Sequence, residues 1–307
     1  MKRREFLRSA VSLGALSGAA FAFGKTSGLF ASPANPVALP YDLVAIKGGE
    51  PDVMFDKAIA SLGGMKQFVR PNQTVVIKPN IGWDTSPERA ANTNPVLVGR
   101  IVEHCKMAGA KSVYVFDHTC NEGTRCYRNS GIEDAVKKAG GTMVSGMSES
   151  YYHPVAVKNG KKLKNAKVHE LILESDVFIN VPILKTHGGT RLTMCMKNLM
   201  GVVWDRGFWH ENDLHQCIAD FATFKKPALN VVDAYRVMKR NGPRGVSVAD
   251  VTSMKYQILS TDMVAADAAA TKVFGLEPGQ VRHIALAEAL GVGTSNLDNL
   301  NINRLTI

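Results

Sequence analysis

The chain has 307 residues, with 37 Lys or Arg against 27 Asp or Glu, which gives a formal net charge of +10 at pH 7. This moderate excess contains no long basic run, so composition argues against a dedicated nucleic-acid-binding protein and we expect no nucleic-acid partner. The five cysteines form no CxxC pair, so their spacing does not support an iron–sulfur cluster or a zinc ribbon, although Cys120 and Cys126 are spaced for a possible loop disulfide.

Residues 1–34 have the pattern of a twin-arginine export signal. Arg3 and Arg4 stand in a polar start, and an apolar run extends from Ser9 to Phe23. The run is shorter than the ~20 residues that a membrane-spanning helix needs, and a charged start before a short apolar run is typical of a signal segment. We therefore expect export by the twin-arginine translocase, a periplasmic or otherwise exported location, and no stable membrane span after cleavage near residue 34. Retention as an uncleaved anchor is the alternative.

After the leader, Val- and Ile-rich runs alternate with helical patterns. Strands are expected at 74–78, 112–117, 142–145, 177–181, 229–233 and 256–260, and helices at 55–62, 95–108, 132–139, 192–200, 213–224, 263–274 and 284–290. Because such alternation is typical of a parallel sheet covered on both faces, the pattern predicts an α/β fold with an open, mainly parallel, doubly wound sheet. Residues 35–307 are expected to form one such domain, with 148–167 as a possible small insertion.

Several predicted strands end in polar side chains. Lys78 and Asn80 close the first strand, Asp117 closes the second, and Asp233 and Asp262 follow later strands. Ligands of open parallel sheets bind beyond the carboxyl ends of the strands, so we expect these groups to meet at one site. Lys is rarely buried unpaired, which makes Lys78 a candidate functional group. The three aspartates could instead cap the helices that follow.

The segment 185–189 (KTHGG) places a lysine, a histidine and two glycines close together. It is expected to be a Gly-rich turn between the strand 177–181 and the helix 192–200. Such a turn offers free backbone N–H groups to an anion. Lys185 adds a positive charge, and His187 could move a proton or bind a metal. The segment therefore predicts an anion site with an acid–base group.

Further candidates lie on the helices and turns that follow. Lys197 and Asn198 belong to a helix with few other polar groups, and Asp267 stands alone in an Ala-rich helix. We expect Asp267 to point back at the lysines. The tight turn 240–245 could close over the site.

His210 and His215 are, with His187, the candidate metal ligands. On one helix their five-residue gap would place the two rings about 140° apart. A shared metal would therefore require His210 to lie before the helix that holds His215. The alternative is a rim histidine beside Trp204.

Several separated runs, among them VVIKPN, NVPILKTHGGTRLTMCMKNLMGVV and LSTDMVAADAAATKVFGL, resemble the family catalogued as domain of unknown function 362 over residues 41–293. Members of this family are widespread in bacteria and archaea and often carry a twin-arginine leader. Many are labelled iron–sulfur proteins because they bear an added cysteine-rich module, whose motifs do not occur in this sequence. The resemblance assigns no roles, but it places ten residues on family motif positions: Lys78, Asn80, Asp117, Lys185, His187, Lys197, Asn198, Asp233, Asp262 and Asp267.

These observations favour an exported α/β enzyme that acts on a small anionic substrate, a carboxylate or a phosphate. The expected catalytic residues are Lys185, His187, Asp117 and Asp233, and the expected substrate-binding residues are Lys78, Asn80, Lys197, Asn198, Asp262 and Asp267. A lysine crowded by other cations has a lowered pKa and can act as a base or as an imine-forming amine. The alternatives are a redox protein that carries a metal or another cofactor, and a non-catalytic protein that binds an anionic ligand.

Overall fold

In the computed structural model, which describes residues 38–307, the chain is built around a mixed, mostly parallel sheet of ten strands. The main path runs β12–β1–β11–β10–β7–β2–β3–β4. The bounds of these strands are β1 Leu43–Lys47, β2 Thr74–Pro79, β3 Ser112–Val115, β4 Thr142–Met143, β7 Val177–Val181, β10 Leu229–Met238, β11 Val251–Ser260 and β12 Ile302–Thr306. The leader predicted at 1–34 lies outside the described residues.

The parallel part of the sheet consists of β10, β7, β2, β3 and β4. Its central strands are almost wholly buried, as their continuous apolar runs predict. β11 pairs antiparallel with both β10 and β1, so one edge of the sheet is mixed.

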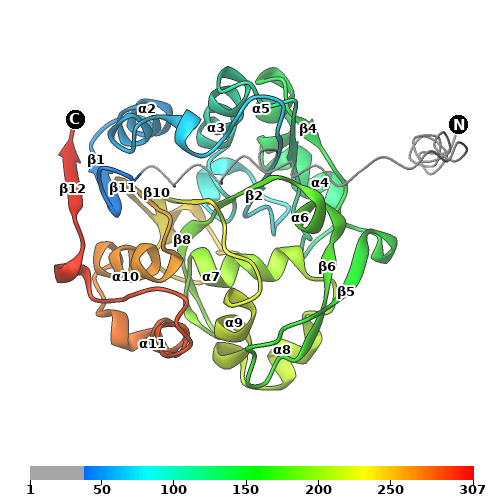
Figure 1. Cartoon of the computed structure of the whole chain (residues 1–307). Helices are drawn as coiled ribbons and strands as arrows, with labels where there is room; N and C mark the ends of the chain where they lie inside the picture. Colours follow the sequence, from blue (N-terminus) through cyan, green and yellow to red (C-terminus); the bar gives the residue numbers. More distant parts are fainter. Residues whose placement is uncertain (1–37) are drawn as a thin grey trace, which may run out of the picture. The chain divides into compact units, whose positions relative to one another are not determined.

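Helices cover both faces of the sheet (Figure 1). One face carries α2 (Pro51–Ser61), α3 (Pro95–Met107), α4 (Gly123–Asn129) and α5 (Ile132–Lys138), whose buried side chains form one apolar cluster with the sheet. The other face carries α6 (Glu170–Glu174), α7 (Cys195–Asn198), α9 (Leu214–Ala222), α10 (Met263–Phe274) and α11 (Arg282–Ala289), which pack in a second cluster. The short helix α8 (Gly207–Glu211) precedes α9. The predicted fold class is confirmed.

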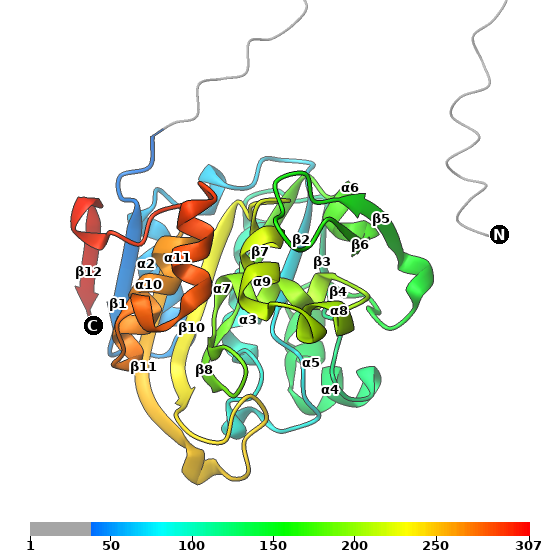
Figure 2. The same ribbon diagram turned by 90° about the horizontal axis from the view of Figure 1, so that it is seen from below.

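A separate hairpin lies beside the main sheet and overlaps the insertion expected at 148–167. It consists of β5 (Tyr152–Ala156) and β6 (Asn165–His169), which pair antiparallel. Figures 1 and 2 show this hairpin beyond α6, at the edge of the domain near β3 and β4. The Trp204 N–H donates to Lys167 O at 2.9 Å, which fastens the hairpin to the chain after α7.

Two local predictions were wrong. The segment 183–193 is not a turn that leads into a helix but a hairpin of β8 (Ile183–His187) and β9 (Arg191–Thr193), with His187 opposite Arg191. β8 also extends the sheet beside β10. The helix expected from residue 192 therefore starts only at Cys195. The two outermost strands on one side of the sheet, β12 and β1, were not predicted. Within residues 38–307, no helix is both long enough and apolar enough to cross a membrane.

Candidate functional site

An inner pocket of about 70 Å³ lies at the carboxyl ends of β2, β3 and β8, where polar side chains from these strands meet. We use this name for the cavity bounded by Lys78, Asp117, Lys185, Lys197 and Arg206, among others. Seven of the ten predicted site residues line it: Lys78, Asn80, Asp117, Lys185, His187, Lys197 and Asn198. Five of these residues come from strands or strand ends, as expected, whereas Lys197 and Asn198 reach the pocket from α7.

Lys78 is held by partners within the protein. Its Nζ lies 3.0 Å from Asp117 Oδ1 in a fully buried ion pair, and it donates to Asn198 O at 2.6 Å and Asn198 Oδ1 at 2.8 Å. Burial lowers the pKa of Lys78, and the Asp117 carboxylate opposes that shift. Asp117 Oδ2 also accepts the Ile81 N–H at 2.7 Å. Three acceptor atoms surround the Lys78 ammonium, so its position in the pocket wall is fixed.

Asn198 connects the strands below the pocket. Its Oδ1 also accepts from Asn80 Nδ2 at 3.0 Å, and its Nδ2 donates to Asn180 Oδ1 at 2.9 Å. Asn180 in turn donates to Asn230 Oδ1 at 3.0 Å. These amides join α7 to β2, β7 and β10. Since buried polar groups are costly unless they are paired, the network fixes the pocket floor.

Lys185 differs from Lys78 because it contacts no carboxylate. Its buried Nζ donates to Asn80 Oδ1 at 3.1 Å and to Ala91 O at 2.5 Å, and it takes part in no ion pair among the described residues. Burial lowers its pKa to about 7, and the nearby Lys197 charge acts in the same direction. Two donated hydrogen bonds satisfy both N–H groups of a neutral amine. Its lone pair is then free near neutral pH.

Lys197 and Arg206 supply the remaining positive charge of the pocket. Lys197 is half-buried on α7, and within residues 38–307 its Nζ has neither a hydrogen bond nor an ion pair. Burial lowers its pKa to about 8. Arg206 donates from Nη1 to His118 O at 2.9 Å and from Nη2 to Thr119 O at 3.0 Å, which fixes the guanidinium at the pocket rim. The pocket therefore contains cations that no protein carboxylate neutralises.

His187 ends β8 and also lines the pocket. Its Nδ1 accepts the Gly189 N–H at 3.0 Å, so the proton of the neutral ring lies on Nε2. Burial, followed by the charges of Lys197 and Lys185, lowers its pKa to about 3. His187 is accordingly a neutral hydrogen-bond donor at neutral pH.

Three predicted aspartates lie outside the pocket and support backbone instead. Asp233 lies inside β10, not at its end, and accepts from the backbone of Asn94 at 2.7 Å and Tyr235 at 3.0 Å. Asp262 is the N-cap of α10, the alternative that the sequence left open. Asp267 is fully buried and accepts from Cys195 N at 2.6 Å and Met196 N at 3.1 Å. None of the three carboxylates borders the pocket, so roles in catalysis or substrate contact are not assigned to them.

The Asp267 contacts also correct the expected anion site at a helix N-terminus. The first N–H groups of α7 are already occupied by this carboxylate. Burial raises the pKa of Asp267 to about 7, and the two backbone hydrogen bonds oppose the shift. Asp267 thus positions the helix that carries Lys197 and Asn198.

The candidate metal ligands do not converge. His210 is exposed on α8, whereas His215 lies on α9 with its Nδ1 3.1 Å from Nδ1 of the buried His283. No group of three or more His, Cys, Asp or Glu among residues 38–307 is arranged to hold a metal ion. His210 lines a wider groove, which His187 and Trp204 line as well.

Sequence reasoning missed several wall residues. Arg206 and Cys120 lie in loops whose composition gives no functional signal, yet both line the inner pocket. Pro243 lines it too, which agrees with the expectation that the turn 240–245 approaches the site. All five cysteines are free, so Cys120 and Cys126 do not form a disulfide.

The chain matches the family described as "Domain of unknown function (DUF362)" over residues 75–272. It belongs to the DUF362 family. A thylakoid-associated protein of Synechocystis sp. is 25% identical over 239 residues, which cover 75% of this chain and 72% of that protein. The matched region of the DUF362 family includes every residue assigned here to the inner pocket.

Two solved structures are similar to this DUF362 protein at low sequence identity. One is a Thermotoga maritima protein, with 9% identity, a TM-score of 0.47, and coverage of 78% of this chain and 60% of that one. The other is the lactate racemase apoprotein of Thermoanaerobacterium thermosaccharolyticum, with 12% identity, a TM-score of 0.46, and coverage of 80% and 56%. The chain thus spans less than two thirds of the length of either solved chain.

Proposed function

We propose that this protein is an enzyme that moves a proton on a small carboxylate or phosphate substrate bound in the inner pocket. One observation carries the proposal. Among the described residues, Asp117 is the only carboxylate that lines the pocket, and it is paired with Lys78. Lys197 and Arg206 have no carboxylate partner among the described residues. A bound anion would supply the missing negative charge.

Lys197 and Arg206 are the proposed anion ligands. Lys197 has no protein partner among the described residues, so binding a substrate costs it no existing hydrogen bond. The guanidinium of Arg206 is already oriented by two backbone carbonyls and can offer further N–H groups to an oxyanion. Charge-assisted hydrogen bonds of this kind are about twice as strong as neutral ones.

Lys185 is the proposed base. Its pKa of about 7 leaves a large neutral fraction at neutral pH, and a base acts best when its pKa lies near the working pH. Imine formation is disfavoured, because it would break the hydrogen bonds that Lys185 Nζ donates to Asn80 and Ala91. His187 would donate from Nε2 to a substrate oxygen on which charge develops.

We also propose that the enzyme acts outside the cytoplasm. This rests on Arg3 and Arg4 and the short apolar run that follows them. Fractionation of cells that express the full chain, compared with an Arg3→Lys/Arg4→Lys variant, tests it: the variant should remain with the cytoplasmic fraction.

The experiment for the reaction is a solvent-exchange screen. Short hydroxy-, oxo- and amino-carboxylates and their phosphate esters are incubated with the protein in D2O, and deuterium at carbon is followed by NMR. Lys185→Ala should lose about 10²–10⁴-fold in exchange rate, the typical contribution of a general base. The matched control, Lys161→Ala, alters an exposed lysine that lines neither cavity. A Lys185→Ala variant with full activity, or no exchange with any compound, would contradict the proposal.

A further inference from the structure

The inner pocket opens into a groove much larger than a small anion requires. The groove has a volume of about 1500 Å³, against about 70 Å³ for the pocket. Both are lined by Trp83, His118, His187, Lys197 and Arg206, so they form one continuous cavity. Sites for drug-sized ligands usually measure about 300–1000 Å³. The groove therefore has room for the body of a ligand whose head alone fits the pocket.

One wall of the groove is the lysine-rich tip of the β5–β6 hairpin. Lys162 and Lys164 line the groove from this tip. The backbone N–H groups of Lys162 and Leu163 donate to the buried Asp220 on α9 at 2.6 and 2.8 Å, which fixes the tip in place (Figures 1 and 2). Backbone anchoring by a buried carboxylate keeps these lysines at the groove rim.

Neither Lys162 nor Lys164 is paired with a carboxylate of the described residues. Lys162 has no ion pair among the described residues, and Lys164 Nζ donates only to the backbone carbonyl of Gly160, at 2.7 Å. Lys167, also on the wall, is already paired with Glu149. The rim therefore carries two cations without carboxylate partners among the described residues, on a different element from Lys197 and Arg206.

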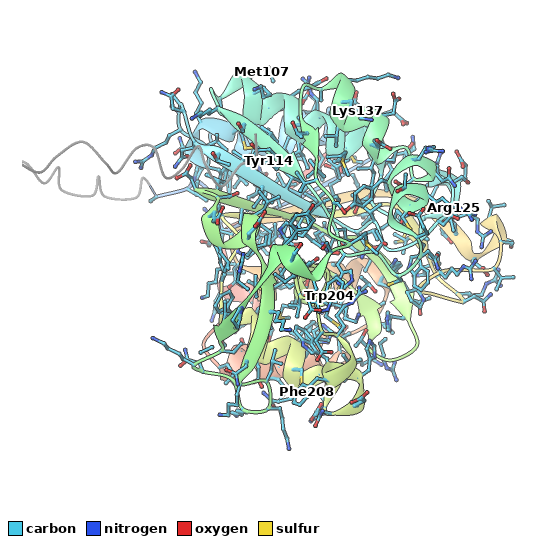
Figure 3. All side chains as sticks on the ribbon, turned by 90° about the vertical axis from the view of Figure 1, so that its right-hand side faces the viewer. Met107, Tyr114, Arg125, Lys137, Trp204 and Phe208 are labelled. Carbon is cyan, nitrogen blue, oxygen red and sulfur yellow. The ribbon has the colours of Figure 1, made fainter. Side chains whose placement is uncertain are left out.

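Apolar side chains line part of the same groove. These are Leu163, Met200, Trp204 and Phe208, of which Figure 3 labels Trp204 and Phe208. Phe208 leaves 40% of its surface exposed, although large apolar side chains gain stability from burial. A ligand with an apolar middle would cover it.

We propose that the ligand is an elongated dianion: a carboxylate or phosphate head in the inner pocket, an apolar middle along the groove, and a second anionic group on Lys162 and Lys164. The position of the head rests on the proposed function, whereas the second anion site rests on the hairpin. Two anion sites joined by one groove favour a ligand that engages both, because the second contact then forms at high effective concentration.

The test is calorimetry on the protein with three probes: inorganic phosphate, n-alkyl monophosphates, and α,ω-alkane diphosphates of the same chain lengths. A series of α,ω-dicarboxylates shows whether the second site distinguishes carboxylate from phosphate. The key variant is Lys162→Ala/Lys164→Ala. The matched control is Lys158→Ala/Lys161→Ala, which removes two exposed lysines of the same hairpin that do not line the groove.

At the best chain length we expect the diphosphate to bind roughly tenfold or more tightly than the monophosphate. The key variant should lose that advantage while keeping the affinity for inorganic phosphate, and the control should keep both. Equal binding of mono- and diphosphates at every length, or an undiminished advantage in the key variant, would overturn this inference alone. Failure of inorganic phosphate to bind would overturn the proposed function instead.

Discussion

Replacing Lys185 by Met should flatten the pH dependence of folding stability. The ordinary lysine pKa of 10.5 falls to about 7 for Lys185 because the side chain is buried, and one pH unit of difference corresponds to about 1.36 kcal/mol. At pH 7 the unfolded lysine is protonated, whereas half of the folded molecules have lost that proton. The folded state therefore carries a penalty of about 4 kcal/mol at pH 7.

The sign of the effect follows from proton binding. Between pH 7 and 10.5 the unfolded chain binds more protons at this group than the folded chain, so stability rises with pH in that window. From pH 7 to pH 10 this single group should contribute an increase of about 3–4 kcal/mol, which the Met variant lacks. Urea unfolding at several pH values measures it, with Lys161→Met as an exposed control.

The slope of the unfolding free energy against pH separates the titration of Lys185 from the loss of its hydrogen bonds. The Met variant also leaves Asn80 Oδ1 and Ala91 O without the Lys185 donor, which changes stability by a similar amount at each pH. If wild type and the Met variant show parallel stability–pH profiles, Lys185 retains its proton throughout. The assignment of a neutral amine would then be refuted.

Three further predictions concern residues in and around the pocket. Gly201→Ala would place a Cβ 1.8 Å from Asp117 Oδ1 and 2.5 Å from Lys78 Nζ. Urea unfolding should therefore show a loss of about 1–3 kcal/mol in the free energy of unfolding. Gly279→Ala is the control and should show no such loss, because no atom lies within 4 Å of its added Cβ. Asp267→Asn should weaken phosphate binding measured by calorimetry and cost about 2 kcal/mol of stability, because an N–H donor replaces one of the two oxygens that accept from the α7 backbone. Unchanged affinity would show that Asp267 does not position Lys197. A thiol reagent should titrate one cysteine per native chain, since four are buried, and Cys120→Ser should abolish the reaction; a second reactive thiol would contradict this burial.

The parallel centre of the sheet and much of the pocket could be predicted because both follow from local patterns. Continuous apolar runs identified β2, β3 and β7, and the carboxyl ends of parallel strands meet at one edge of a sheet. Lys78 and Asn80 were therefore brought to the pocket by their position at the end of β2. The same rule brought Asp117 to Lys78 from a different strand.

What could not be predicted depends on long-range contacts. The sequence does not show that β10 continues past Asp233, which turns an expected strand end into a mid-strand residue that supports the N-terminus of α3. Gly188 and Gly189 are compatible both with a turn that precedes a helix and with the turn of the β8–β9 hairpin. The hairpin forms because β8 pairs with β10 and β9, and these contacts are not visible in the local sequence. Arg206 becomes a pocket residue only through its bonds to the carbonyls of His118 and Thr119.

The most direct test of the central claim is a calorimetric titration of inorganic phosphate into the native protein and its Lys197→Ala variant at neutral pH. The pocket described here predicts saturable binding at one site in the native protein and in the Lys161→Ala control, and loss of that binding in Lys197→Ala. No binding to the native protein, or equal binding to the Lys197→Ala variant, would contradict the assignment of the inner pocket as an anion site.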